Sequence, residues 1–371
     1  MGYRTQIPWL YPEEQRRLAE ALLKKALEAT PPSNEMSFPN PLEFSQADLA
    51  EFTNNFHGGN LIGPTQFGKL YRGKINARDV TVKIWDGGQY GEQCGEHYGL
   101  DYPGAYSIML AEEMLLLRDS NVNHHPSLPK LIGYCIQDQM KGLVYDLNPR
   151  GSLHNLTTEG SFTWIERIKV VLRFAHLLEL LHGQANPYIV LCIDAEHILL
   201  DQESNPVVVE FGLMRGGNLG QLSPFKELIP MSPGYCDIHY ARTGVGWVAH
   251  CDVFSYGIIL LGLISKRVID KEKLGTNRLF RTDVWARKNY KPGCSLVDTS
   301  LEVDSDFCVS DGAAMTKLGI SCVEEYPGDR PTMKTVVKSL ESLLAVQCSR
   351  VEYLSFLDSF KAKATISVGC Q

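Results

Sequence analysis

The spacing of hydrophobic residues changes along the chain and divides it into segments. Residues 11–29 combine strong helix formers with leucines on one helical stripe, with glutamates early and lysines late. This pattern predicts an amphipathic helix that docks on its own domain, with docking on a partner protein as the alternative. Residues 30–41 are interrupted by prolines and predict a linker.

From Phe44 onward the pattern becomes mainly that of strands, after a short helix capped by Ser45. A further helix is expected over residues 110–117. The Gly- and Tyr-rich stretch at residues 87–105 has no apolar period and predicts an exposed loop. Strands are expected in three alternating stretches, at residues 60–71, 75–85 and 130–147.

After Gly151 the helical period dominates. A β-rich first part followed by a helix-rich second part predicts two packed lobes and an α+β fold. The apolar run at residues 253–264 is too short to cross a bilayer, which needs about 20 apolar residues, and predicts a buried helix. Helices are expected at residues 164–182, 252–265, 313–324 and 333–344.

Charge and cysteine spacing exclude several classes of protein. Among 371 residues, 36 Lys and Arg face 43 Asp and Glu, a net charge of −7, so a nucleic-acid binder with a basic face is not expected. The cysteines form no C-x-x-C pair, which is typical of reduced thiols in a cytosolic protein. No secretory signal or transmembrane segment is expected. Acylation of Gly2 stays open, because Gln6 stands where Ser or Thr is preferred.

Five motifs follow one another in the order of a known family. They are LIGPTQFGKLYRG at 61–73, VTVK at 80–83, LVYDLNPRGSL at 143–153, CDVFSYGIILLGLIS at 251–265 and GDRPTM at 328–333. From about Phe44 to Leu344 the chain resembles protein kinases, and among them the plant receptor-like and receptor-like cytoplasmic kinases. The resemblance implies an α+β, bilobal protein-kinase-like fold with an N-terminal helical extension. The expected boundaries are 1–43 for the extension and linker, 44–147 for the N-lobe, 148–346 for the C-lobe and 347–371 for a C-terminal tail.

The resemblance also places the catalytic positions by spacing. Anchoring on ILLD at 198–201 puts the family's HRD triplet at residues 190–192 and its DFG triplet at residues 210–212. The metal-binding Asn position is then His197. The intervals between these positions match those of the family without a gap, so the substitutions are real departures from its pattern.

Those substitutions remove the groups that phosphoryl transfer needs, a carboxylate that accepts the hydroxyl proton and oxygen ligands for Mg²⁺. Cys192 offers a thiol that is mostly neutral, since its ordinary pKa is about 8.5. His197 offers nitrogen where Mg²⁺ prefers oxygen. Glu210 keeps a carboxylate but extends it by one methylene, about 1.5 Å. We therefore expect a degenerate catalytic site, no metal site and no enzymatic activity.

The Gly-rich loop is altered less. Gly63 and Gly68 are retained, but the middle glycine of the family falls at Thr65, directly after Pro64. A Cβ atom and a fixed φ at these positions hinder the approach of backbone N–H groups to phosphates. Thr81 replaces the small residue that covers the adenine in the family and is expected to narrow the pocket.

The lysine that contacts ATP in the family is retained as Lys83. Its expected ion-pair partner is Glu113, or Glu112 if the helix register differs by one. One interpretation is residual ATP or ADP binding without Mg²⁺. The other, which we favour, is a Lys–Glu pair that only ties a helix to the sheet. No cofactor is required in either case.

The substrate-side segment departs from the family as well. The APE triplet aligns with residues 237–239, so the glutamate becomes His239 and Arg330, its expected partner, loses a carboxylate. Residues 213–233 are then free to serve another purpose. Asp252, which in the family holds the catalytic loop by backbone hydrogen bonds, is retained.

These departures favour a catalytically inactive pseudokinase that acts through protein contacts. The chain resembles the ZED-type adaptor pseudokinases of plants, which implies an adaptor between an NLR immune receptor and a pathogen-modified kinase. One alternative is a scaffold or allosteric partner of an active receptor kinase, and another is an atypical serine/threonine kinase of weak activity. The expected partners are an NLR receptor and active receptor-like cytoplasmic kinases. The expected location is the cytoplasm, with recruitment to the plasma membrane by partners left open.

Overall fold

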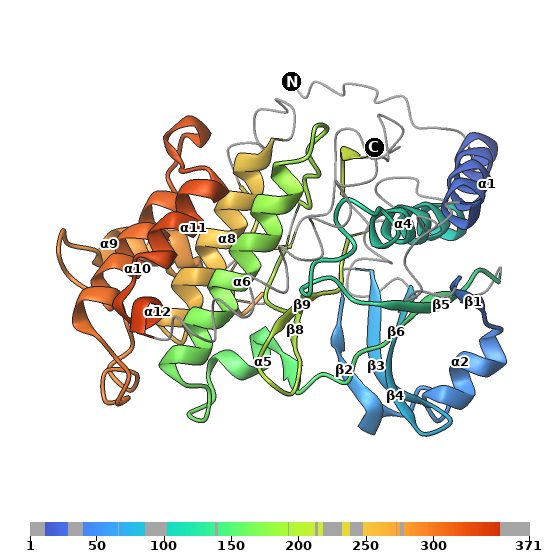
Figure 1. Ribbon diagram of the computed structural model, residues 1–371, viewed down its shortest axis with the longest axis horizontal. Helices are drawn as coiled ribbons and strands as arrows, with labels where there is room; N and C mark the ends of the chain where they lie inside the picture. The colour runs from blue at the N-terminus through green and yellow to red at the C-terminus, as the bar shows by residue number, and fades with distance from the viewer. Residues whose placement is uncertain are drawn as a thin grey trace. The chain divides into compact units, whose positions relative to one another are not determined.

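A computed structural model describes most of the chain (Figure 1). The described residues are 12–28, 40–65, 67–85, 102–137, 140–191, 193–211, 214–217, 232–237, 248–271, 273–274 and 278–348. The chain divides into two compact units. The first unit comprises Met1–Asp119, Lys130–Asn148 and Glu210–Pro230, and the second comprises Ser120–Pro129, Pro149–Val209 and Met231–Gln371.

A six-stranded sheet forms the centre of the first unit. In sheet order its strands are β1 (Leu42–Glu43), β5 (Leu131–Cys135), β6 (Lys141–Tyr145), β4 (Arg78–Trp85), β3 (Gly68–Ile75) and β2 (Leu61–Pro64). β1 is parallel to β5, and the other neighbouring strands are antiparallel. The helical elements are α1 (Pro12–Glu28), α2 (Gln46–Phe52), η1 (Gly58–Asn60) and α4 (Tyr102–Leu117).

The sheet has α2 on one side and α4 on the other (Figure 1). Successive residues of a strand point to opposite faces, so β4 serves both sides. Val80, Val82 and Ile84 pack with Leu49 of α2 in one apolar cluster. Lys83 lies between Val82 and Ile84 in β4, so its side chain points to the other face of the sheet and contacts α4.

The second unit is mainly helical. Its elements are β7 (Gly151–Ser152), α5 (Leu153–Thr157), α6 (Trp164–His182), β8 (Ile198–Leu200), β9 (Pro206–Val208), α8 (Ala249–Ile264), η3 (Arg278–Phe280), α9 (Thr282–Asn289), α10 (Val309–Cys322), η4 (Pro327–Asp329), α11 (Met333–Glu341) and α12 (Leu344–Cys348). The strands form a small antiparallel sheet in the order β7-β8-β9. A capping box between Thr163 and Glu166 starts α6, and every residue of α8 from Cys251 to Ile264 is buried.

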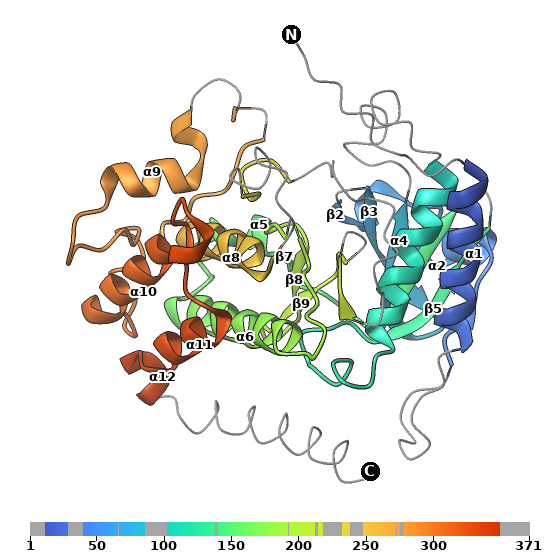
Figure 2. The same ribbon diagram turned by 90° about the horizontal axis from the view of Figure 1, so that it is seen from above.

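The predicted α+β fold and N-terminal helix are confirmed. α1 ends within one residue of the expected limits on each side, and α6 spans the predicted residues 164–182. Within the first unit α1 lies alongside α4 (Figures 1 and 2), so it docks on its own domain as expected. Among the described residues, no helix combines the length and the apolar character that a membrane span requires.

Several predicted boundaries are wrong. The break expected between residues 71 and 75 falls inside β3, and the helix expected from residue 313 starts at Val309. The loop expected at residues 87–105 ends earlier, because α4 already starts at Tyr102. Pro103 is tolerated in the first turn of a helix, and the buried residues from Tyr106 onward continue the helix into the core. Residues 86–101, like most of the linker expected at residues 30–41, lie outside the described part of the chain.

Candidate functional site

Lys83 is the centre of a buried ionic cluster in the first unit. Its Nζ atom donates to Glu113 Oε2 on α4 at 2.7 Å and to Glu210 Oε1 at 3.0 Å. Tyr145 at the end of β6 donates its hydroxyl hydrogen to the other carboxylate oxygen of Glu113. All four side chains are buried. The fold thus brings three of the predicted site residues together and adds Tyr145, which the sequence analysis did not identify.

The charges in this cluster are unequal, because one ammonium group meets two carboxylates. Burial by itself would lower the pKa of Lys83, but the charges of Glu113 and Glu210 outweigh burial and raise that pKa above its ordinary value. Burial raises the pKa of Glu113, and the charge of Lys83 opposes this while that of Glu210 adds to it. The charge of Lys83 is therefore already balanced by carboxylates of the same unit.

The raised pKa of Glu113 predicts how stability depends on pH. Between the ordinary pKa of 4.5 and the raised value, the folded protein binds more protons than the unfolded one, so this contribution to stability falls as the pH rises. Glu113→Gln should remove the effect. We therefore measure the free energy of unfolding of both proteins in urea. The value for the wild type minus that for the variant should be larger at about pH 5 than at about pH 7. An equal difference at both pH values would contradict the raised pKa.

Glu112, the alternative partner considered for Lys83, points elsewhere because neighbouring helix positions are about 100° apart. Its Oε2 atom is buried without a hydrogen-bond partner among the described residues. Burial raises the pKa of Glu112 well above its ordinary value, and the charge of Arg215 acts in the opposite direction. The register of α4 therefore selects Glu113 as the partner of Lys83.

Thr81, at the position that covers adenine in the family, forms a hydrogen bond within the first unit. Thr81 on β4 is fully buried, and its hydroxyl donates to the backbone carbonyl of Leu147 at 2.8 Å. The side chain therefore connects the sheet to the segment that follows β6. That Thr81 narrows a nucleotide pocket stays a prediction.

The two retained glycines of the Gly-rich loop lie in different surroundings. A Cβ atom on Gly68 would lie 1.8 Å from the carbonyl oxygen of Ile84 on the paired strand β4. A Cβ atom on Gly63 would have no described atom within 4 Å. The pairing of β3 with β4 is therefore sufficient to require glycine at position 68, whether or not a phosphate binds.

This difference predicts opposite outcomes for two matched substitutions. We expect Gly68→Ala to lower the free energy of unfolding of the first unit by about 1–3 kcal/mol, because the strands must separate. Gly63→Ala should change it by less than about 0.5 kcal/mol. Chemical denaturation of both variants measures the effect, and equal stabilities would show that the close approach at Gly68 relaxes without penalty.

In the second unit, Asp252 holds the catalytic-loop segment as the resemblance implied. Its two carboxylate oxygens accept hydrogen bonds from the backbone N–H groups of Val190 and Leu191, both at 2.9 Å. Leu191 has a φ of 59°, a left-handed conformation that needs such support in a non-glycine residue. His182 Nε2 lies 2.9 Å from the same carboxylate. Cys192, the next position, lies outside the described residues.

A carboxylate that the sequence analysis missed lies in the same loop. Asp194 is buried and accepts a hydrogen bond from the Ser232 hydroxyl at 2.7 Å and from the backbone N–H of Glu196 at 2.8 Å. Lys271 Nζ and His197 Nε2 lie 3.5 and 3.6 Å from its oxygens. Burial alone would raise the pKa of Asp194, but these neighbours lower it. The sequence shows an acidic residue at position 194, but it does not show that Ser232 and Lys271 lie beside it.

The expected loss of a carboxylate partner for Arg330 is wrong. Arg330 Nη1 lies 2.5 Å from Asp237 Oδ2, and both side chains are buried. The same guanidinium donates to the carbonyls of His250 and Glu324 at 2.9 and 2.8 Å. Asp237 stands two positions before His239, where the family has its glutamate. From this earlier position the aspartate, whose side chain is shorter than that of glutamate, contacts Arg330. His239 itself lies outside the described residues.

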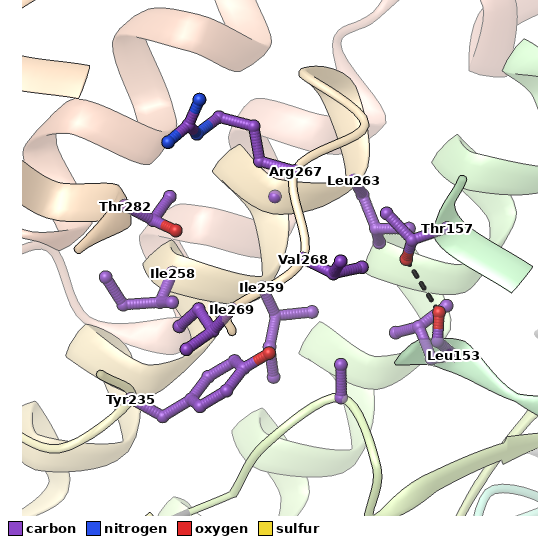
Figure 3. Close-up of a pocket in the computed structure, with 12 residues that line it drawn as sticks. Leu153, Thr157, Tyr235, Ile258, Ile259, Leu263, Arg267, Val268, Ile269 and Thr282 are labelled. Atoms are coloured by element: carbon purple, nitrogen blue, oxygen red, sulfur yellow. Dashed lines mark hydrogen bonds between the residues drawn. The ribbon is translucent and has the colours of Figure 1, made fainter. Parts of the chain in front are cut away.

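The second unit also contains an apolar pocket (Figure 3). Leu153 and Thr157 of α5 face Ile258 and Ile259 of α8, and Tyr235 closes another side. The Thr157 hydroxyl is used within α5, where it donates to the carbonyl of Leu153 at 2.6 Å. Among the described residues that line this pocket there is no acidic or imidazole side chain, so these residues offer no acid–base pair.

No group of three or more His, Cys, Asp or Glu side chains that could hold a metal ion occurs within the part of the chain that the structure describes. Glu210, at the position where the family uses a metal-binding aspartate, is bonded to Lys83 instead. Mg²⁺ prefers several oxygen ligands in octahedral geometry. One of the two carboxylate oxygens that Glu210 could offer to Mg²⁺ is therefore already bonded to Lys83.

The fold and these motifs are those of a protein kinase domain. A family profile described as protein tyrosine and serine/threonine kinase matches residues 56–340, and the chain belongs to this family. Its relatives include the probable serine/threonine-protein kinases PBL10 and PBL25 of Arabidopsis thaliana. PBL10 is 31% identical over 315 residues, covering 82% of this chain and 74% of PBL10. PBL25 is 31% identical over 355 residues, covering 92% of this chain and 86% of PBL25.

A third relative comes from another plant. The EPD1-interacting receptor-like cytoplasmic serine/threonine-protein kinase of Nicotiana benthamiana is 30% identical over 315 residues, covering 81% of this chain and 63% of that protein. These relatives are named as kinases. Within the family, the chain is therefore similar to plant receptor-like cytoplasmic kinases.

Proposed function

We propose that this chain is a catalytically inactive member of its family, a pseudokinase that acts by protein–protein contacts. The bond between Lys83 and Glu210 carries the proposal. In the family the lysine contacts phosphate and the acidic residue of the DFG position binds metal. Here the two groups bond each other, which supports the proposal that neither keeps the role that the family gives it.

The remaining catalytic positions support the same proposal. Cys192 has no carboxylate, and the nearest one in the sequence, Asp194, already accepts hydrogen bonds from Ser232 and Glu196. His197 is buried, with Nε2 facing Asp194 at 3.6 Å. A general base must reach the substrate hydroxyl, and a buried carboxylate with these partners is poorly placed to do so.

As the biological role we propose an adaptor between a plant NLR immune receptor and a pathogen-modified kinase. The resemblance to ZED-type pseudokinases and the similarity to receptor-like cytoplasmic kinases support it. The protein then works in the cytoplasm and at the plasma membrane when partners recruit it, without a required cofactor. A scaffold for an active receptor kinase is the second candidate, and residual ATP or ADP binding without Mg²⁺ is compatible with both.

A phosphotransfer assay tests the loss of activity. Purified protein is incubated with radiolabelled ATP and either Mg²⁺ or Mn²⁺, together with a generic acceptor protein, and compared with Lys83→Met. We expect equal incorporation by both proteins. Incorporation above that of Lys83→Met would establish the atypical kinase, for which the intact Lys83–Glu113 pair is the supporting observation.

Affinity purification from plant tissue tests the adaptor role. The tagged chain is recovered and its partners are identified by mass spectrometry. Recovery of an NLR receptor, with or without an active cytoplasmic kinase, supports the adaptor. Recovery of membrane receptor kinases without an NLR receptor overturns it in favour of the scaffold.

A further inference from the structure

The helix α4 is buried around its whole circumference. Every side chain from Tyr106 to Leu117 is buried, including those that point away from the sheet. A helix that packs on a sheet with one face normally presents its other face to water. The outer face of α4 therefore needs a cover, and α1 lies alongside it in both views (Figures 1 and 2).

The pattern of α1 fits this role. Ala19, Leu22 and Ala26 share one helical stripe and are 4%, 3% and 0% exposed. The two alanines flank the leucine and let the helices approach closely. The opposite side is charged and exposed, with ion pairs of Arg16 with Glu20 at 3.9 Å and Lys24 with Glu28 at 3.8 Å.

The docked state of α1 depends on this contact. An isolated helix of about 15 residues is marginal in water, and exposed ion pairs add little to its stability. α1 should therefore be helical when docked and unfold when released. Such an element has two states that a small difference in binding can select.

The consequence of release reaches the Lys83 cluster through α4. Glu113 extends from α4 to Lys83 and Tyr145, and these bonds require α4 to lie at its present distance from β4 and β6. Without α1, the apolar outer face of α4 would be exposed to water. Moving or fraying of α4 would then lower the free energy by reducing this exposure. Either change would weaken the bonds of Glu113.

We propose that α1 is a displaceable clamp on α4. Docked, it holds Glu113 on Lys83 and covers the outer face of α4. Released, it loosens the Lys83 cluster and exposes an apolar surface of the kind that accepts an amphipathic helix. The clamp is a property of the first unit and does not depend on whether the protein transfers phosphate.

Hydrogen exchange of the full chain tests the clamp. Leu22→Asp places a charge in the docked stripe, and Lys24→Asp places the same side chain on the exposed side of the same helix as a matched control. Exchange is followed by mass spectrometry in α1, in α4 and in α6 of the second unit. Acetylation of Lys83 by acetic anhydride provides a second readout, since this amine is fully buried.

We expect exchange in α1 and α4 of Leu22→Asp to be about tenfold faster or more, and Lys83 to become acetylated, while α6 stays unchanged. Lys24→Asp should match the wild type. Fast exchange in α1 with unchanged α4 and Lys83 would overturn the proposal and make α1 a passive cover. Fast exchange in α6 of Leu22→Asp would mean that the whole chain is destabilised, and the milder Leu22→Ala is then used. For this variant we again expect faster exchange in α1 and α4 and acetylation of Lys83. Fast exchange in α1 alone would again overturn the proposal.

Discussion

Replacing Lys83 with methionine is expected to lower the free energy of unfolding of the first unit by about 3–5 kcal/mol. The substitution leaves the buried carboxylates of Glu113 and Glu210 without the ammonium group that both now bond. Protonation of Glu113, whose pKa is already raised, limits the loss but does not remove it. Hydrogen exchange of β3 and β4 in urea measures the effect, because the two units can unfold separately.

Two controls separate the ionic effect from a general effect of the substitution. Lys74→Met on the neighbouring strand removes an exposed lysine that lies 3.6 Å from Asp79, and should change stability by less than about 0.5 kcal/mol. In the double variant Glu113→Gln and Glu210→Gln, Lys83→Met should be far less destabilising. A Lys83→Met protein as stable as the wild type would show that the three charges do not support the fold.

A second large effect is expected in the second unit. Arg330→Met should lower its free energy of unfolding by about 3–5 kcal/mol, because Asp237 is left buried and several carbonyl oxygens lose their donor. The guanidinium also lies 4.9 Å from the centre of the Phe254 ring, a contact that methionine replaces only in part. Chemical denaturation, followed by hydrogen exchange in α8, measures the loss.

The exposed Lys334 on α11 supplies the matched control, since Lys334→Met removes a nearby positive charge without a buried partner. Asp237→Asn keeps the shape of the side chain and should be less destabilising than Arg330→Met. The double variant should be less destabilising than the sum of the two single changes, because the residues form one pair. Strict additivity would show that Asp237 does not replace the family's glutamate.

These expected effects describe a protein that retains the ionic contacts of a kinase fold while changing their chemistry. Lys83 still ties α4 to the sheet, and Asp252 still fixes Leu191 in its left-handed conformation. At both places a buried charge is matched by a partner, as an interior of low polarity demands. In our proposal the selection for folding persists at these positions after selection for phosphate transfer has ended.

Much of the fold was predictable from local patterns. The periods of the apolar residues located α1 and α6, because helix faces repeat over distances of a few residues. They indicated the strand-rich part of the chain but not the limits of β3, whose residues 72–74 were expected to lie between two strands. Short elements without a full period, such as α5 and α9, were missed. The start of α4 at Tyr102 was missed as well, because burial by the rest of the unit decides it.

The candidate site was predictable only in part, for the same reason. The resemblance paired Lys83 with Glu113 or Glu112, and the structure selects Glu113. The contact of Lys83 with Glu210 joins residues 127 positions apart, and no local pattern predicts it. Asp194 and Asp237 were visible as acidic residues, but their partners Ser232 and Arg330 depend on how the chain returns to the same place.

The sequence by itself determined which functional groups this protein has at its catalytic positions. Residue identity and spacing are properties of the chain, so the thiol at Cys192, the imidazole at His197 and the longer carboxylate at Glu210 follow from it directly. The tertiary structure alone decided which charges neutralise each other. Ion pairs act over a few ångströms, and only folding brings Glu210 to Lys83 and Asp237 to Arg330 at such distances.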